Sequence, residues 1–238
     1  MEKKTYNEIA DWYCSLRNDS AISLVDDMIY PFIMELASKN SNQLILDLGC
    51  GQGKLSRFLA KSGNNVVGVD ISKNLIEHAI EIEKTEQLGI RYFVDDAQEL
   101  DTQTEDLFDG IICHMALMDI VNIKEVFFAS YSKLKQGGWF AFTITHPCFD
   151  SPYAKWDKNN SRVIHEYLEE YFWKSKNPNG IRGQVGAHHR KLSTYINVLI
   201  ETGFQIKKIE EPEATAIVMD HIPGCLKVPL YLFVSTCK

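Results

Sequence analysis

Short apolar runs alternate with longer amphipathic segments along most of this chain. Seven runs are typical of buried strands, at positions 44–48, 66–69, 90–94, 108–113, 139–145, 204–209 and 230–235. Four segments between them place apolar residues at helical spacing, at 54–61, 73–86, 124–134 and 192–201. Because strands that alternate with helices usually pair in parallel, the pattern predicts an α/β protein whose mostly parallel sheet is covered on both faces.

Some parts of the chain depart from this alternation. Two amphipathic helices are expected before the first strand, at about 6–16 and 22–38. The last two strand-like runs have no helical segment between them, so we expect them to form a hairpin-like pair. About forty residues separate the fifth run from the helix at 192–201, too many for an ordinary connection. We expect an insert there, with a short helix near 163–173.

Length and composition bound the domain organisation. With 238 residues, 45% of them hydrophobic, the chain can bury one substantial core, so we expect a single domain. The first residues lack the apolar stretch of a signal peptide, and no run approaches the roughly 18 apolar residues of a membrane span. These observations predict a cytoplasmic protein with no membrane partner.

Charge and cysteine content narrow the possible partners. The formal net charge is −7 and the pI about 5.5, which argues against a nucleic-acid partner, because phosphate binding depends on Lys and Arg. The six cysteines include no C-x-x-C pair, which favours reduced thiols over a disulfide framework or a zinc site. No metal site is expected, and a homodimer stays open as the oligomeric state.

The most informative motif is the run 46–53, LDLGCGQG, which follows the apolar pair at 44–45. Glycine has no Cβ, so alternating glycines between a buried strand and a helix bring backbone amides close to a ligand. A dinucleotide-binding loop, G-x-G-x-x-G, needs a third glycine at Lys54 or Ser56, and neither is one. That difference argues against a nicotinamide-dependent oxidoreductase. The run instead has the form acidic-x-Gly-x-Gly-x-Gly, headed by Asp47.

A second carboxylate follows the second strand-like run. Ligands of open α/β sheets bind outside the carboxyl ends of the strands, and Asp70 occupies that position. There it can accept hydrogen bonds from both hydroxyls of a ribose, each worth about 1.5–3 kcal/mol. The alternative role is a helix N-cap, which Ser72 can also fill.

Taken in order, these motifs resemble those of class I S-adenosylmethionine (SAM) dependent methyltransferases. The resemblance covers residues 44–146 and rests on the acidic-x-Gly-x-Gly-x-Gly run, Asp70, the pair Asp95-Asp96, the strand that contains Asp109, and the pair Gly137-Gly138. It implies a Rossmann-like, doubly wound sheet of seven strands with an antiparallel last strand, and SAM as the cofactor. The glycine pair is expected to close the helix at 124–134.

The resemblance also implies which residues contact SAM. The glycine run and the ends of the next three strands contribute most of them: Asp47, Gly49, Cys50, Gly51, Gly53, Asp70, Ile71, Ser72, Asp96, Ala97, Gln98, Cys113, His114 and Met115. Asp96 is expected to accept from the adenine amino group, with a solvated turn as the alternative. Met115 is expected to lie along the methionine part, with core packing as the alternative. Tyr13 is expected to bound the methionine end, unless the N-terminal helices only dock on the core.

The methyl acceptor is expected on the side of the insert. Residues 147–188 are rich in aromatic side chains and are expected to form a lid. His146 precedes Pro147 at the end of the fifth strand and is the candidate general base, because histidine titrates near neutrality. A structural hydrogen bond at the root of the lid is its alternative role. His189 and Arg190 are further candidates, to clamp the lid or an acidic group of the substrate.

We therefore expect one domain over residues 1–238. It comprises a helical cap at 1–40, a SAM-binding core at 41–146, the lid insert at 147–188 and a C-terminal core at 189–238. The expected function is transfer of a methyl group from SAM to an oxygen or nitrogen of a small molecule. The alternatives are a methyltransferase that acts on a tRNA base or a protein side chain, and a non-catalytic SAM-binding module.

Overall fold

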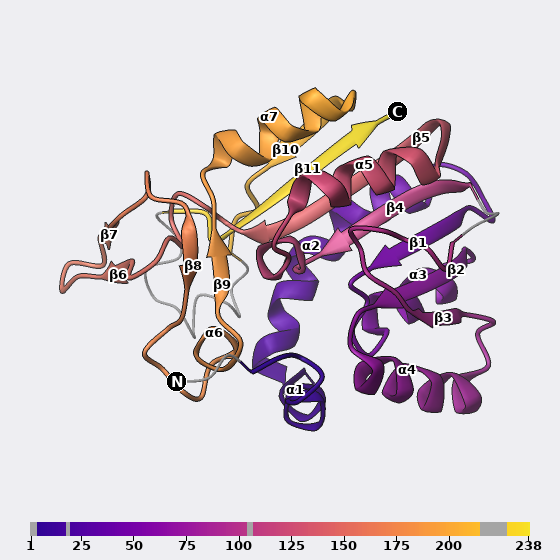
Figure 1. The fold of residues 1–238 in the computed structure, drawn as a ribbon, viewed down its shortest axis with the longest axis horizontal. Coiled ribbons are helices and arrows are strands. Elements are labelled where there is room, and N and C mark those ends of the chain that lie inside the picture. Colours follow the sequence, from indigo (N-terminus) through magenta and orange to yellow (C-terminus); the bar gives the residue numbers. More distant parts are fainter. Residues whose placement is uncertain (1–3, 18–19, 104–106, 215–227) are drawn as a thin grey trace.

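The computed structural model describes residues 4–17, 20–103, 107–214 and 228–238. This part of the chain forms a central sheet of seven strands: β1 (Leu44–Leu48), β2 (Asn65–Asp70), β3 (Arg91–Val94), β4 (Phe108–His114), β5 (Leu134–Thr145), β10 (Gln205–Glu210) and β11 (Tyr231–Cys237). They lie in the order β10-β11-β5-β4-β1-β2-β3 (Figure 1). Neighbours are parallel except where β11 pairs with β5 and β10. The predicted mostly parallel sheet with an antiparallel last strand is confirmed.

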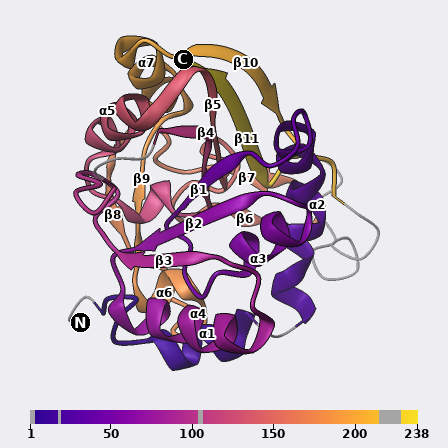
Figure 2. The same ribbon diagram turned by 90° about the vertical axis from the view of Figure 1, so that its right-hand side faces the viewer.

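Helices cover both faces of the sheet, as the alternation predicts. One face carries α5 (Ile123–Lys133) and α7 (Leu192–Thr202), and the other carries α2 (Ser20–Ala37), α3 (Lys54–Lys61) and α4 (Lys73–Glu86) (Figure 2). Successive side chains of a strand point to opposite layers. Leu46 packs in the layer that contains Phe127 of α5, whereas Ile45 packs in the layer that contains Ile29 of α2. All four side chains are fully buried, so the core lies on both sides of the sheet.

The junction between α5 and β5 differs from the prediction. α5 ends at Lys133, and Leu134 already has an extended backbone (φ −84°, ψ 141°) as the first residue of β5. Gly137, with φ +78°, lies inside this strand, where its N–H donates to the Lys238 carbonyl over 3.2 Å. The expectation that the glycine pair closes the helix is therefore wrong. By contrast, β1, α3 and α4 have the boundaries that the hydrophobic pattern predicts.

The insert between β5 and α7 is built mainly from short strands. β6 (Lys155–Trp156) pairs with β7 (Arg162–Val163), and β8 (Tyr171–Trp173) pairs with β9 (Ala187–His189), both antiparallel. The helix expected near 163–173 is wrong, and the helix of the insert is instead α6 (Ile181–Gln184). Consecutive aromatic residues suit a pleated strand, and the ring of Phe172 packs against His188 of β9 with centroids 5.2 Å apart.

The N-terminal segment lies against the start of α4. Asn7 Oδ1 accepts from the backbone N–H of Asn74 over 2.9 Å, and the Asn7 carbonyl accepts from Asn74 Nδ2 over 2.7 Å. Helix α1 (Ala10–Arg17) follows, beginning later than the predicted position 6. The rings of Tyr6 and Tyr13 meet edge to face with centroids 5.2 Å apart. Of the helices in the described ranges, none is long and apolar enough to cross a membrane.

Candidate active site

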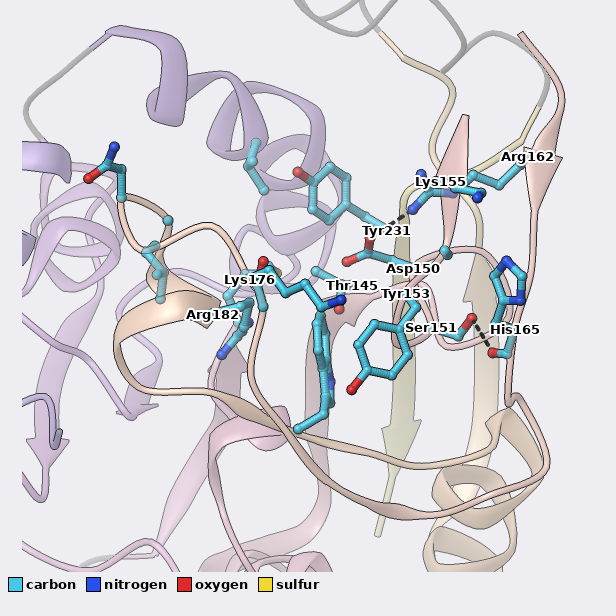
Figure 3. A pocket seen from close by; sticks show the side chains of 18 of the residues that line it. Thr145, Asp150, Ser151, Tyr153, Lys155, Arg162, His165, Lys176, Arg182 and Tyr231 are labelled. Atoms are coloured by element: carbon cyan, nitrogen blue, oxygen red, sulfur yellow. Dashed lines mark hydrogen bonds and ion pairs between the residues drawn. The ribbon is translucent and has the colours of Figure 1, made fainter. Parts of the chain in front are cut away.

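Two cavities adjoin at the carboxyl edge of the sheet. The smaller lies at the ends of β1 to β4 and is lined by the glycine loop, Asp70 and Asp96. The larger, of about 1050 Å³, lies between the insert, the N-terminal helices and the end of β5 (Figure 3). Tyr6, Tyr13 and Met115 line both cavities. These three side chains therefore form the boundary between the two spaces.

The glycine loop is held against β2 by backbone hydrogen bonds. The N–H groups of Gly49 and Cys50 donate to the Val69 carbonyl over 2.8 and 2.9 Å. Gly49 (φ +73°) and Gly51 (φ +56°) have left-handed backbones and line the smaller cavity. A Cβ on Gly49 would lie 2.6 Å from the Ala116 Cβ, so only glycine fits there. The loop can thus approach the end of β4 closely.

Gly53 has a different environment from the first two glycines. It also has a left-handed backbone, with φ +78°, but it does not line the smaller cavity. A Cβ at this position would lie 2.3 Å from the Tyr92 hydroxyl oxygen. The third glycine of the motif therefore makes room for Tyr92, and its expected contact with SAM stays a prediction.

Asp70 connects the loop to the end of β2. Its Oδ2 accepts from the backbone N–H of Gly51 over 2.9 Å, and its Oδ1 accepts from that of Ser72 over 2.8 Å. Burial raises the pKa of this carboxyl, although both N–H donors lower it. A carboxylate has about four lone-pair sites, so Asp70 keeps acceptor capacity for a ligand. Ile71 also lines the cavity and is exposed, whereas the Ser72 hydroxyl caps α4 by accepting from Leu75 over 3.3 Å.

The acidic pair after β3 lies beside the end of β2, where the Asp95 N–H donates to the Asp70 carbonyl over 3.1 Å. Asp95 Oδ2 accepts from the Thr102 backbone N–H over 3.0 Å and so orders the following turn. Asp96 Oδ1 accepts from the Gln98 backbone N–H over 2.9 Å. Both carboxylates line the cavity together with Ala97 and Gln98. The structure thus brings the predicted Asp96, Ala97 and Gln98 into the same cavity as Asp70, at the end of the neighbouring strand.

The end of β4 places consecutive side chains on opposite sides. Cys113 is fully buried in the layer of α5 and lines neither cavity, so its expected contact with the cofactor stays a prediction that the placement of its side chain does not support. His114 does line the smaller cavity, and its Nε2 donates to Asp26 Oδ1 over 3.2 Å. Met115 has φ +57°, a strained value for a residue with a Cβ. That backbone turn directs its side chain into the boundary between the cavities, where strained residues often serve a site.

Asp47 and Cys50 lie beneath the glycine loop, where they line a small side cavity with Gly49, Gly51 and His114. Asp47 is 1% exposed and accepts from the Ser56 hydroxyl over 2.5 Å. Burial raises the pKa of Asp47 to about 7. The buried Cys50 thiol has a pKa raised well above its ordinary value, also by burial, and is therefore protonated at neutral pH.

Sequence comparison and structural comparison agree on the family. Residues 45–138 match the model of a methyltransferase domain. A SAM-dependent methyltransferase from Mesorhizobium loti superposes with a TM-score of 0.76 at 27% identity, covering 90% of this chain and 100% of that one. The chain is a class I SAM-dependent methyltransferase. SAM is accordingly its cofactor.

Two curated relatives of this methyltransferase match over different shares of their own lengths. An uncharacterized protein of Haemophilus influenzae is 29% identical over 80% of this chain and 78% of its own. A ubiquinone biosynthesis O-methyltransferase of Hydrogenovibrio crunogenus is 27% identical over 63% of this chain and 62% of its own. The methyltransferase thus spans less than two thirds of the latter relative.

His146, the candidate base of this methyltransferase, lies outside both cavities. Its side chain is 1% exposed and lines neither cavity. Nδ1 accepts from the Cys148 backbone N–H over 3.2 Å, so Nε2 carries the proton and donates to Glu211 over 2.8 Å. Burial lowers the pKa of this imidazole, although Glu211 raises it. The lone pair of Nδ1 already accepts the Cys148 N–H, so it is not free to take a proton from a substrate. The hydrogen bonds of His146 fit its alternative role, a structural hydrogen bond at the root of the insert.

The two candidate clamp residues also hold the protein rather than a ligand. Arg190 is buried and donates to three carbonyls of the segment after β4, those of Leu117, Ile120 and Val121. His189 Nε2 is hydrogen-bonded to the Tyr167 carbonyl over 3.0 Å. Neither lines the larger cavity. They fasten the insert to the core of the methyltransferase.

A cluster that the motifs did not predict lies where the two cavities meet. The Tyr6 hydroxyl and the Arg182 guanidinium both donate to Asp119, one to each carboxylate oxygen. Asp119 belongs to η1 (Leu117–Asp119), a single 3₁₀ turn after β4. Burial and the Asp119 carboxylate raise the pKa of Tyr6 well above its ordinary value, so its hydroxyl stays a donor at physiological pH. These partners lie too far apart in the chain for any motif spacing to reveal them.

Proposed function

We propose that this methyltransferase transfers the methyl group of SAM to an oxygen or nitrogen of a small molecule bound in the larger cavity. The observation that carries the proposal is the shared boundary of the two cavities, formed by Tyr6, Tyr13 and Met115. At about 1050 Å³, the larger cavity is slightly larger than typical small-molecule sites, which measure about 300–1,000 Å³. An acceptor held there lies next to the cofactor cavity.

The residues of the smaller cavity fit an adenosyl ligand by their chemistry. Asp70 offers a carboxylate at the end of β2 for ribose hydroxyls, and Asp96 offers one at the end of β3 for an adenine amino group. Val69, Leu75 and Ile120 give the same cavity an apolar wall against which a flat base can pack. When bound, SAM supplies a methyl group made electrophilic by its sulfonium.

The contribution of the chain is chiefly to hold the reacting groups in position. Methyl transfer is an in-line displacement, which gains most from fixing the nucleophile and the methyl in near-attack geometry. Tyr6 is locked by its hydrogen bond to Asp119, and Met115 by a backbone bond to the Thr143 carbonyl over 2.9 Å. Both therefore form fixed walls between cofactor and acceptor.

Two features favour a small acceptor over a tRNA base or a protein side chain. The insert contributes residues from 150 to 182 to the wall of the larger cavity, so the space beside the cofactor cavity is bounded by the insert as well as by the sheet edge. The chain as a whole is acidic, with a formal net charge of −7. Similarity to a ubiquinone biosynthesis O-methyltransferase also supports an oxygen acceptor on a small molecule.

The proposal can be tested in two steps. Calorimetry with SAM, its demethylated product S-adenosylhomocysteine and NAD should show binding of the first two only. Release of S-adenosylhomocysteine should then be measured with pools of small hydroxylated or amino compounds, with total tRNA and with a protein extract. Turnover with a small-molecule pool alone is the expected result. Turnover that requires tRNA or protein would overturn the assignment, and SAM binding without turnover in any pool would favour the non-catalytic alternative.

A further inference from the structure

The walls of the larger cavity carry more positive than negative side chains. Among the residues of the described ranges that line it, four are basic, namely Lys155, Arg162, Lys176 and Arg182, and two are acidic, Asp150 and Glu166. The whole chain has the opposite balance, with 25 basic and 32 acidic residues. The cavity therefore departs from the charge of the molecule around it, and such local charge commonly matches the charge of a ligand.

Both arginines already have a carboxylate partner. Arg162 Nη2 donates to Asp150 Oδ1 over 3.1 Å, and Arg162 Nε donates to the Phe149 carbonyl over 2.7 Å. Arg182 donates to Asp119. These ion pairs leave little net charge at either arginine, and they fix the two guanidinium groups as parts of the wall.

The remaining acidic residue of the wall has only a neutral hydrogen-bond partner, which leaves its negative charge in place. Glu166 Oε2 accepts a hydrogen bond from the Tyr171 hydroxyl. Lys155 and Lys176, in contrast, form no ion pair with any carboxylate of the described ranges. The two lysines are thus the basic groups of the cavity whose charge is not matched by a neighbour in this part of the chain.

The two lysines come from separate parts of the insert. Lys155 lies on β6, and Lys176 lies in the segment between β8 and α6. Figure 3 shows Lys176 reaching into the hollow on the side of Arg182, with Lys155 beside Arg162 on the far side of Asp150. Because both sides of one cavity present an ammonium group, a ligand between them can be held from two directions.

From this arrangement we infer that the methyl acceptor is a small anion, whose carboxylate or phosphate is bound by Lys155 and Lys176. The inference rests on the proposed function and names the class of its substrate. The anionic group lies toward the insert, and the atom that receives the methyl group lies toward Tyr6, Tyr13 and Met115. Hydrogen bonds from ammonium groups to an oxyanion are stronger than those between neutral groups, so the anion fixes the orientation of the acceptor.

The test compares matched anionic and neutral probes on protein saturated with S-adenosylhomocysteine. Benzoate is paired with benzamide, indole-3-acetate with indole-3-acetamide, and inorganic phosphate serves as a probe without an apolar part. Calorimetry or ligand-detected NMR measures each affinity in the wild type, in Lys155→Met/Lys176→Met and in the control Lys158→Met. Lys158 lies between β6 and β7, is exposed and does not line the cavity.

We expect the anion of at least one pair to bind the wild type at least tenfold more tightly than its amide, and added salt to reduce this preference. The double variant should lose the preference, while Lys158→Met keeps it. Equal binding of acids and amides, an unchanged preference in the double variant, or no anion binding at millimolar concentration would overturn the inference. S-adenosylhomocysteine affinity is measured on the same samples. A wild-type protein that does not bind S-adenosylhomocysteine would defeat the proposed function. A wild-type protein that binds it but does not prefer anions would defeat only the inferred class of acceptor.

Discussion

The Tyr6 hydroxyl donates a hydrogen bond to Asp119 Oδ2 over 3.1 Å and so joins the N-terminal cap to the turn after β4. The other oxygen of Asp119 accepts from Arg182, which belongs to α6 of the insert. One carboxylate thus connects three segments of the chain at the point where the two cavities meet. We expect this cluster to fix the positions of the N-terminal cap and the insert relative to each other at the site.

Breaking the cluster should destabilise the fold in a graded way. Asp119→Asn leaves the largely buried Arg182 guanidinium without its counter-charge, at a cost of about 3 kcal/mol in the free energy of unfolding. Tyr6→Phe removes one hydrogen bond to a charged group, worth about 1.5 kcal/mol. Urea unfolding measures both free energies.

Tyr153→Phe is the matched control, because that ring lines only the larger cavity and is 48% exposed. An Asp119→Asn variant as stable as this control would contradict the role of the cluster.

Asp70 should matter more for the cofactor than for folding. Asp70→Ala removes the acceptor for the Gly51 and Ser72 N–H groups and the carboxylate proposed for the ribose. The Kd for SAM should rise at least about tenfold, or about 1.4 kcal/mol. Calorimetry on the variant and on Asp101→Ala, an exposed carboxylate that lines neither cavity, checks this. An unchanged Kd in folded Asp70→Ala would remove Asp70 from the cofactor site.

The fold could be predicted from the sequence wherever a segment is long enough to show its period. Helix α4 keeps its apolar spacing over Lys73–Glu86 and begins at a residue that caps it, Ser72, so both type and start were predictable. The strands of the insert have only two or three residues each, as in β7 and β8. A period cannot be recognised over so few positions, and pairing with a distant strand decides their conformation.

The site was predictable where its residues end a strand. Asp70 and Asp96 line the cofactor cavity because carboxyl ends of parallel strands share one edge. Cys113, one residue before His114, packs in the opposite layer, because a shift by one residue along a strand moves a side chain to the other face. The contact between Tyr6 and Asp119 joins residues 113 positions apart, and only the folded chain brings them together.

Gly53 gives a test that separates packing from ligand binding. Gly53→Ala combines a left-handed backbone with a Cβ 2.3 Å from the Tyr92 hydroxyl oxygen. Gly63→Ala is the control, because Gly63 has φ +89° but a Cβ added there would meet nothing within 4 Å. Backbone strain of about 1 kcal/mol is common to both, and overpacking should cost Gly53→Ala about 1–3 kcal/mol more. Thermal unfolding measures the difference between the two variants. The cost of Gly53→Ala should be smaller when it is measured in a Tyr92→Ala background than in the wild type.

The ligand readout decides which role Gly53 has. If the third glycine serves Tyr92, folded Gly53→Ala retains a Kd for SAM close to that of the wild type, since the residue does not line the cofactor cavity. A large loss of SAM affinity in a variant whose stability matches that of Gly63→Ala would instead return Gly53 to the cofactor site.

His146 should make the free energy of unfolding fall as the pH drops below 6.5. Burial lowers its pKa below the ordinary 6.5, so between the two values the unfolded chain binds more protons than the folded chain. The stabilisation that His146 provides is therefore present above pH 6.5 and is lost as the pH falls toward its lower folded-state pKa. His146→Asn should cost about 2 kcal/mol at pH 7.5, for two buried hydrogen bonds, and less at pH 5.

Urea unfolding of wild type and His146→Asn across this pH range measures the difference directly. Asp47, whose pKa burial raises to about 7, acts in the opposite direction, but it is present in both proteins and cancels. Once an acceptor is known, His146→Asn should retain the pH profile of kcat, because the imidazole lines neither cavity. Loss of the alkaline or acid limb of that profile in a folded variant would restore His146 as the base. Retention of the profile with a smaller pH dependence of stability would establish that this histidine secures the root of the insert.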